Sequence, residues 1–94
     1  MNWETPPLGF HSVLFDRTEP GQNAYRYYLV AWWPTLLDEG AVIRTYGRKG
    51  ASQTVRVTPF PSLAEARPLI RATIKTRLRH RYRVVEPEVY RDES

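Results

Sequence analysis

The sequence predicts an α+β fold, an antiparallel sheet of four to five strands with one amphipathic helix packed on one face. Several short segments rich in β-branched and aromatic residues are separated by connections of hairpin length, which join antiparallel strands. One later segment repeats its apolar residues at the helical period. A chain of 94 residues forms one domain with a single core. Because one helix covers only one face of a sheet, we expect the other face to stay partly open.

The strands are predicted from side-chain alternation and from the turn residues between them. Four strands are expected at residues 10–17, 24–33, 41–48 and 53–58, with a short fifth at 81–85. The segment 24–33 is dense in aromatic and β-branched residues and is expected to lie in the centre of the sheet. The domain is therefore placed at residues 10–85, between a Pro-rich lead-in at 1–9 and an acidic tail at 86–94.

A helix is predicted to begin after Ser62. Ser62 and Glu65 form a capping box, in which the serine hydroxyl and the glutamate satisfy amides of the first turn. One apolar face then follows at helical spacing, formed by Leu63, Ala66, Ile70, Ile74 and Leu78. Pro68 lies past the first turn, where it removes a backbone hydrogen bond, so we expect a kink or a distorted first turn there.

The composition limits the classes of function. The chain has no cysteine, which excludes disulfides and cysteine-ligated metals, and no spacing typical of a metal or cofactor site is present. The longest apolar run, residues 27–33, is too short to span a bilayer, and the first residues lack the pattern of a signal peptide. We therefore expect a cytoplasmic protein with no cofactor, no membrane contact and no small-molecule substrate.

The net charge of +4 is distributed unevenly along the chain. Residues 1–43 hold two arginines against five acidic residues, and residues 84–94 hold one arginine against four. Residues 44–83 hold nine arginines and two lysines against one glutamate. A basic block of this kind predicts a positively charged face that attracts polyanions such as nucleic acids.

The most informative motif is the segment 44–50, Arg-Thr-Tyr-Gly-Arg-Lys-Gly. Side chains alternate along a strand, so Arg44, Tyr46 and Arg48 are predicted to share one face. A planar ring between guanidinium groups can stack on a sugar or base while the arginines hold phosphate oxygens. Taken alone, the segment is equally consistent with nucleic-acid binding and with an ordinary solvated hairpin.

Other candidates have both a structural and a functional interpretation. A basic ridge is predicted on the helix from four cations at i+4 spacing: Arg67, Arg71, Lys75 and Arg79. It is either a binding surface or a solvated face. Trp32 and Trp33 point to opposite faces of a regular strand, and we expect both in the core. Tyr82 is expected to be a packing residue.

A catalytic function is not predicted. His11 and His80 are the only histidines, and a histidine pair can run ribonuclease chemistry by general acid–base transfer. The sequence contains no clustered carboxylates and no phosphate-binding Gly-rich loop beside them. We therefore expect a protein that is not an enzyme.

The order of these motifs resembles the WGR domain family, named for a Trp-Gly-Arg signature. The resemblance extends from about Val13 to Val85. It is carried by Asn23, by the Arg-Tyr-Tyr triplet at 26–28, by the segment 44–50, and by Phe60, Leu63, the Ala-Glu-Ala start of the helix at 64–66, Lys75 and the Arg-Tyr pair at 81–82. Tyr46 stands where the signature has tryptophan, which keeps a flat stacking face but reduces its area.

The resemblance implies a WGR-like fold and nucleic-acid binding. In poly(ADP-ribose) polymerases this domain helps to recognise broken DNA ends, the signature aromatic stacking on a terminal sugar. Tyr46 would then stack, Arg48 would contact phosphate or a partner, and Asn23 would lie near the nucleic-acid backbone. The candidate binding residues are Asn23, Arg26, Arg44, Tyr46, Arg48, Lys49 and Arg56. We expect DNA ends or nicks, rather than RNA, as the ligand; the alternative is a protein-interaction adaptor that uses the same exposed sheet face.

Overall fold

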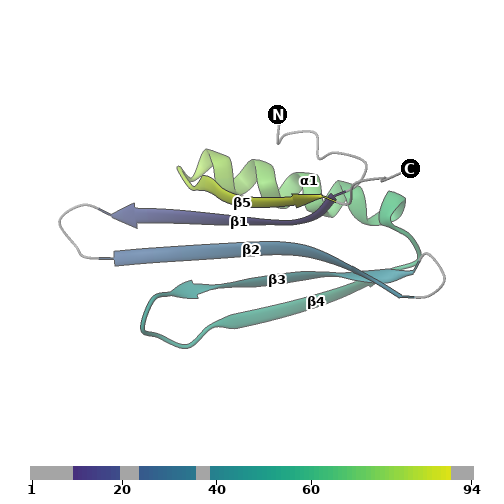
Figure 1. The fold of residues 1–94 in the computed structure, drawn as a ribbon, viewed down its shortest axis with the longest axis horizontal. Helices are drawn as coiled ribbons and strands as arrows, with labels where there is room; N and C mark the ends of the chain where they lie inside the picture. Colours follow the sequence, from purple (N-terminus) through teal and green to yellow (C-terminus); the bar gives the residue numbers. More distant parts are fainter. Residues whose placement is uncertain (1–9, 20–23, 36–38, 90–94) are drawn as a thin grey trace.

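The computed structural model of the chain describes residues 10–19, 24–35 and 39–89 (Figure 1). The elements are β1 (Phe10–Glu19), β2 (Ala24–Pro34), β3 (Gly40–Arg48), β4 (Thr54–Phe60), α1 (Leu63–Arg79) and β5 (Arg83–Val89). The five strands form one antiparallel sheet in the order β4-β3-β2-β1-β5. The α+β class and the five-stranded antiparallel sheet predicted from the sequence are therefore confirmed.

The core lies between α1 and one face of the sheet. The residues Ala66, Ile70 and Ile74 of α1 are fully buried in one cluster with apolar residues of β1, β2 and β3. On β2 the cluster takes alternate residues, Tyr28, Val30 and Trp32, so these side chains define the helix-side face of the sheet. We call the other side the second face; its β2 residues are the odd-numbered ones between Tyr25 and Trp33.

The two tryptophans of β2 have different environments. Trp32 is buried in the core, as predicted, whereas the prediction that Trp33 is also a core residue is wrong, because 62% of its surface is exposed. The strand alternates between the two faces, and the core cluster that includes α1 takes its β2 residues from the helix-side one. An apolar side chain on the second face therefore stays in contact with solvent.

The start of α1 follows the predicted capping box. Ser62 has extended backbone angles, and its Oγ accepts a hydrogen bond from the Glu65 N–H at 3.2 Å. The helix continues through Pro68 to Arg79, and the first turn is intact, with the Ala66 N–H donating to the Ser62 carbonyl at 3.1 Å. The expected distortion is therefore not seen. Proline removes the bond to the carbonyl of Ala64, which is exposed and open to water.

Because of the cap at the end of α1, the last strand begins later in the sequence than predicted. The Tyr82 N–H donates to the Arg77 carbonyl and the Arg81 N–H to the Leu78 carbonyl, which is the Schellman pattern of a helix C-terminus. Residues 81 and 82 are thus used in the cap, and β5 begins at Arg83 and continues to Val89, farther than the predicted 81–85. The first four residues of the segment predicted as an acidic tail are part of this strand.

Arg81 has a backbone conformation that favours glycine, with φ at 66°. We expect Arg81→Gly to raise the free energy of unfolding by about 0.5–1 kcal/mol, because the left-handed conformation strains any residue with a Cβ atom. Urea denaturation checks this value. Arg81→Ala removes the same charge without relieving the strain and is the matched control. A glycine variant no more stable than the alanine variant would contradict the account.

A buried carboxylate joins β1 to β5. Asp16 is 3% exposed, and its Oδ1 accepts a hydrogen bond from Arg83 Nε at 2.6 Å. The Tyr25 hydroxyl donates to Asp16 Oδ2 at 3.1 Å. The bond from Arg83 holds the pKa of Asp16 below its ordinary value of 3.8, although burial opposes this shift. Burial of the Tyr25 hydroxyl and its hydrogen bond to the Asp16 carboxylate raise the pKa of Tyr25.

Acid should therefore weaken the sheet. Because the pKa of Asp16 is lower in the folded than in the unfolded chain, its stabilisation is present above the ordinary value of 3.8 and is lost as the pH falls through the lower folded pKa. We expect the free energy of unfolding to decrease between about pH 5 and pH 3. Urea titrations of the wild type and Asp16→Asn measure this. The variant should be less stable at pH 6 by about 1 kcal/mol and should show a smaller decrease on acidification.

Candidate nucleic-acid interface

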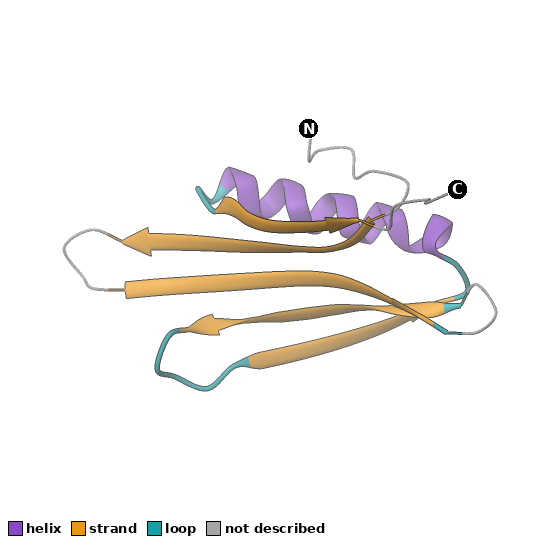
Figure 2. Cartoon of the chain, in the orientation of Figure 1, coloured by secondary structure: helices purple, strands orange, loops and turns teal. Residues whose placement is uncertain are grey.

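The residues of the segment 44–50 lie on the helix-side face of the sheet. Tyr46 pairs with Tyr28 across β2 and β3, and Arg44 pairs with Val30. Directly opposed residues project to the same face, and Tyr28 and Val30 are in the core. Arg44, Tyr46 and Arg48 therefore share the face against which α1 packs. In the view of Figure 2, β1 and β2 lie between α1 and the turn that joins β3 to β4.

Three tyrosines and one arginine are layered on this face. The rings of Tyr28 and Tyr46 stack with centroids 4.9 Å apart and an interplanar angle of 3°. The guanidinium of Arg77 lies 4.5 Å from the centre of the Tyr28 ring and 5.2 Å from that of Tyr82. These four residues form what we call the tyrosine–arginine stack. Tyr46 is thus supported by a ring of the core, which fixes its position before any ligand binds.

The hydroxyl of Tyr46 has a role that a tryptophan could not fill. Arg56 pairs with Arg44 across β3 and β4, and Arg56 Nε donates a hydrogen bond to Tyr46 Oη at 2.9 Å. An indole has only an N–H donor and could not accept this bond. Arg44 is oriented in the same way by a hydrogen bond from its Nη2 to Thr58 Oγ1 at 3.4 Å.

A groove of about 430 Å³ opens beside the stack. It is lined by Arg26, Tyr27, Tyr28, Tyr46, Gly47, Arg48, Arg77 and Tyr82. In the part of the chain that the structure describes, the Arg77 guanidinium contacts rings and no carboxylate, and the ion pair seen is that of Arg83 with Asp16. Arg77 Nε is buried with no hydrogen-bond partner. A desolvated cation of this kind favours an anionic ligand.

The stack also determines the charge state of its buried tyrosine. Burial raises the pKa of the Tyr28 hydroxyl, and the nearby Arg44 and Arg77 oppose this shift. Tyr28 is therefore a neutral phenol at physiological pH, and the groove keeps its positive charge.

The structure brings together only part of the predicted set. Arg26, Tyr46 and Arg48 line the groove, and Arg44 and Arg56 lie on the same face beside it. Lys49 is exposed in the turn, where Gly50 has a φ of 85°. Asn23 lies outside the described residues.

Five lining residues are not among the predicted binding residues: Tyr27, Tyr28, Gly47, Arg77 and Tyr82. Arg77 could have been found, because it follows Ile70 and Ile74 at spacings of seven and three and therefore lies on the buried side of α1. An arginine on an apolar helix face needs a partner. Tyr82 packs against the core, as predicted, and also lines the groove.

The predicted basic ridge is separate from the groove. Arg71, Lys75 and Arg79 are exposed, and Arg67 is half-buried. On a helical projection the three exposed cations point away from Ala66 and Ile70, which are buried. The ridge and the groove thus lie on different sides of α1.

The signature glycine has a packing role on the second face. A Cβ atom at Gly47 would lie 3.2 Å from Tyr27 Oη and 3.2 Å from the Ser52 carbonyl oxygen. Tyr27 crosses over this glycine to donate a hydrogen bond to Gln53 Oε1 at 3.2 Å. Gly47 therefore lets the hairpin close tightly next to the two groove residues Tyr46 and Arg48.

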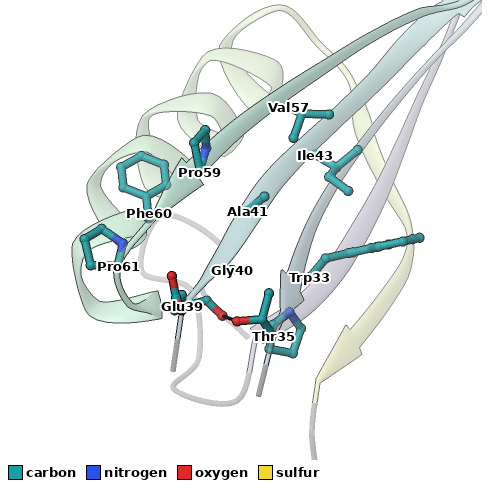
Figure 3. Close-up of a pocket in the computed structure, with 11 residues that line it drawn as sticks. Trp33, Thr35, Glu39, Gly40, Ala41, Ile43, Val57, Pro59, Phe60 and Pro61 are labelled. Carbon is teal, nitrogen blue, oxygen red and sulfur yellow. Dashed lines mark hydrogen bonds between the residues drawn. The ribbon is translucent and has the colours of Figure 1, made fainter. Parts of the chain in front are cut away.

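A second groove, of about 690 Å³, lies at the other end of the β3–β4 hairpin (Figure 3). Figure 3 shows the side chains of Trp33, Ile43 and Val57 projecting from three neighbouring strands. Trp33, Val55 and Val57 are 62%, 52% and 61% exposed. The second face thus presents an apolar surface that is distinct from the basic groove.

The two histidines lie in unrelated parts of the fold. His11 is half-buried in β1, and His80 is exposed at the C-cap of α1. Over residues 10–19, 24–35 and 39–89, no three residues of the His, Cys, Asp or Glu type gather in a way that could hold a metal ion. The one described helix is too short and too polar to cross a membrane.

These features define a small α+β module with a groove lined by tyrosines and arginines. The model of the WGR domain family matches residues 11–89, nearly the whole chain, and the chain therefore belongs to the WGR domain family. WGR domains are non-catalytic, nucleic-acid-binding modules in poly(ADP-ribose) polymerases and related proteins. Comparison of the chain with curated proteins and with solved structures gave no match.

Proposed function

We propose that the chain is a non-catalytic module that binds DNA ends or nicks through the groove beside the tyrosine–arginine stack. The observation that carries the proposal is the guanidinium of Arg77, held between the rings of Tyr28 and Tyr82 and facing a groove lined by Arg26 and Arg48. Fixed cations bind phosphate oxygens, and a supported ring offers a platform for a terminal sugar or base. In this proposal α1 packs on one face of the sheet only, which is the WGR arrangement. The protein acts in the cytoplasm.

The position of Tyr46 supports a preference for ends. Its ring already stacks on Tyr28, and Thr54 is its neighbour across β4. A nucleotide inside a duplex is stacked on both sides and cannot reach this ring without unstacking, which costs a few kcal/mol. A terminal or nicked nucleotide has one exposed face, so it can meet the ring at a smaller cost.

The test is fluorescence anisotropy of labelled DNA in four forms: blunt-ended, hairpin-capped, nicked and single-stranded, each at two salt concentrations. We expect preference for free ends or nicks, and weaker binding at higher salt because phosphate contacts release counterions. Tyr46→Ala should remove the preference, and Tyr46→Phe, which keeps the ring but loses the bond from Arg56, should retain it. Equal binding of the four forms would reduce the function to a general polyanion surface, and no binding at low salt would overturn the proposal.

A second candidate, a protein-interaction adaptor, is favoured by the apolar surface around Trp33 and Val57. Exposed apolar patches of this kind mark interaction sites. Because that surface lies on the second face, the two functions depend on different residues. An adaptor should lose its partner in Trp33→Ser and tolerate both Arg48→Gln and raised salt; the DNA-binding module should show the reverse.

A further inference from the structure

Three arginines form a row across the sheet at its hairpin end. Arg17 of β1 pairs with Arg26 of β2, and Arg26 pairs with Arg48 of β3. Residues directly opposed across neighbouring strands project to one face. The next row consists of Phe15, Tyr28 and Tyr46, which are on the helix-side face, and residues two apart along a strand point the same way. The three guanidinium groups therefore lie on the face that holds the groove.

The row extends beyond the groove. Arg26 and Arg48 line the groove, whereas Arg17 does not. The strand β5 begins at Arg83, opposite Asp16, so β1 is the edge of the sheet at the position of Arg17. A ligand that lies over Arg48 and Arg26 can thus continue over Arg17 without meeting another strand.

The row has about the axial length of three nucleotides of a nucleic-acid strand. Neighbouring strands lie about 4.8 Å apart, so the three backbone positions span about 10 Å. One nucleic-acid strand carries a charge about every 3.4 Å of rise, which places about three phosphates over that length. Like charges directly opposite one another on a sheet repel, and a row of phosphates relieves this repulsion.

The other arginine pair of the face lies on β3 and β4. Arg44 donates to Thr58, and Arg56 donates to Tyr46. Arg56 thus supports the stack, and Arg44 is held against Thr58 of β4. A strand of nucleic acid that crossed β1, β2 and β3 would use the row, whereas one that ran parallel to β3 would meet Arg44 and Arg56.

We propose that Arg48, Arg26 and Arg17 bind consecutive phosphates of one nucleic-acid strand, which crosses the sheet at right angles to β1, β2 and β3 and leaves it over Arg17. The inference rests on the proposed function and deepens it. It gives the direction of the bound strand and adds Arg17 as a phosphate contact. Contacts of this kind position the strand without reading its sequence.

The first test is the salt dependence of binding to the DNA form that the wild type binds best. Each phosphate contact contributes about 0.7–0.9 to the slope of log Kd against log salt concentration. We expect Arg17→Gln to lower the slope by about this amount and to weaken binding several-fold, and Arg17→Lys to restore the slope. Arg71→Gln, an equal loss of charge on the outer side of α1, is the matched control and should leave the slope unchanged.

The second test locates the contacts on the ligand. Single methylphosphonate linkages, which remove one phosphate charge, are placed at successive positions of the strand. Each linkage is tested with the wild type and with Arg48→Gln, Arg26→Gln and Arg17→Gln. A methylphosphonate that weakens binding of the wild type but not of one variant marks the phosphate that the replaced arginine contacts. We expect three consecutive positions in that order. An oligoribonucleotide series should give the same order if the row reads only phosphates.

The outcomes separate the row from the function. One result would overturn the row and leave the groove as the binding site. In that result Arg17→Gln keeps the wild-type salt slope and is coupled to no phosphate position, whereas Arg48→Gln has a lower slope and is coupled to one position. If the wild type binds none of the DNA forms at low salt, the proposed function itself fails. Thermal unfolding of each variant shows that the losses come from a folded protein.

Discussion

Replacing Arg48 and Arg77 together by glutamine is expected to weaken DNA binding by about a hundredfold at physiological ionic strength, about 2.7 kcal/mol. Each guanidinium forms charge-assisted hydrogen bonds to phosphate, for which a loss of about tenfold is reasonable. The two residues come from β3 and from α1 and meet only at the groove. The slope of log Kd against log salt concentration should decrease by about 1.4–1.8, since two cations are removed.

The matched control for this experiment is Arg71→Gln combined with Lys75→Gln. Both residues are exposed on the outer side of α1, and the loss of net charge is the same. The control should bind within about threefold of the wild type, because long-range attraction is screened beyond about 8 Å at physiological ionic strength. Equal losses in the two double variants would mean that the net charge, and not the groove, holds the DNA. That result would also restore the basic ridge as a candidate binding surface.

The sequence was sufficient to predict the elements but not the surroundings of Tyr46. Alternation placed Arg44, Tyr46 and Arg48 on one strand face, and the register agrees with that. The partner of Tyr46 depends on which residue of β2 lies opposite, and a shift of one residue reverses every face. Only the register shows that Tyr28 supports the ring and that α1 packs against the same face.

Arg77 illustrates the same limit for the helix. Its position on the buried side of α1 can be read from the sequence, but its contacts with Tyr28 and Tyr82 depend on how the helix packs on the sheet. The row of Arg17, Arg26 and Arg48 also needs two strand registers at once. The composition showed a basic block at 44–83, whereas two members of this row come from the acidic part of the chain. Linear charge counting therefore points to neither; Arg26 was predicted through the family resemblance, and Arg17 was not predicted.

The division of the sheet into two faces separates the candidate functions. The basic row, the tyrosine–arginine stack and the core all use the helix-side face, and the exposed Trp33 and Val57 use the second face. A single strand thus serves both surfaces through alternate residues. From the sequence, one face was predicted to serve either an adaptor or a DNA-binding module. The exposed apolar residues that we propose for an adaptor lie on the second face, opposite to the groove.

The largest loss of stability from a small substitution is expected at Gly40. A Cβ atom there would lie 2.4 Å from the Trp33 carbonyl oxygen and 2.6 Å from Cζ2 of the Trp32 ring. The oxygen belongs to the backbone of β2, which pairs with β3 at Pro34 and Gly40, and the indole is buried in the core. Neither neighbour can move without loss of strand pairing or of packing. Gly40→Ala should therefore lower the free energy of unfolding by about 3 kcal/mol.

Gly50→Ala is the control that separates steric conflict from backbone strain. Gly50 has a φ of 85°, and a Cβ atom added there would meet no other atom within 4 Å, so only the conformational cost of about 1 kcal/mol applies. For a domain of this size, 1 kcal/mol corresponds to about 4–8 °C in Tm, so Gly40→Ala should unfold more than about 12 °C below the wild type. Gly40 lies about 26 Å along β3 from Arg48, so the folded variant should bind DNA with wild-type affinity at low temperature. Equal decreases in Tm for the two variants would show that the contact between Gly40 and Trp32 does not determine the stability of the sheet.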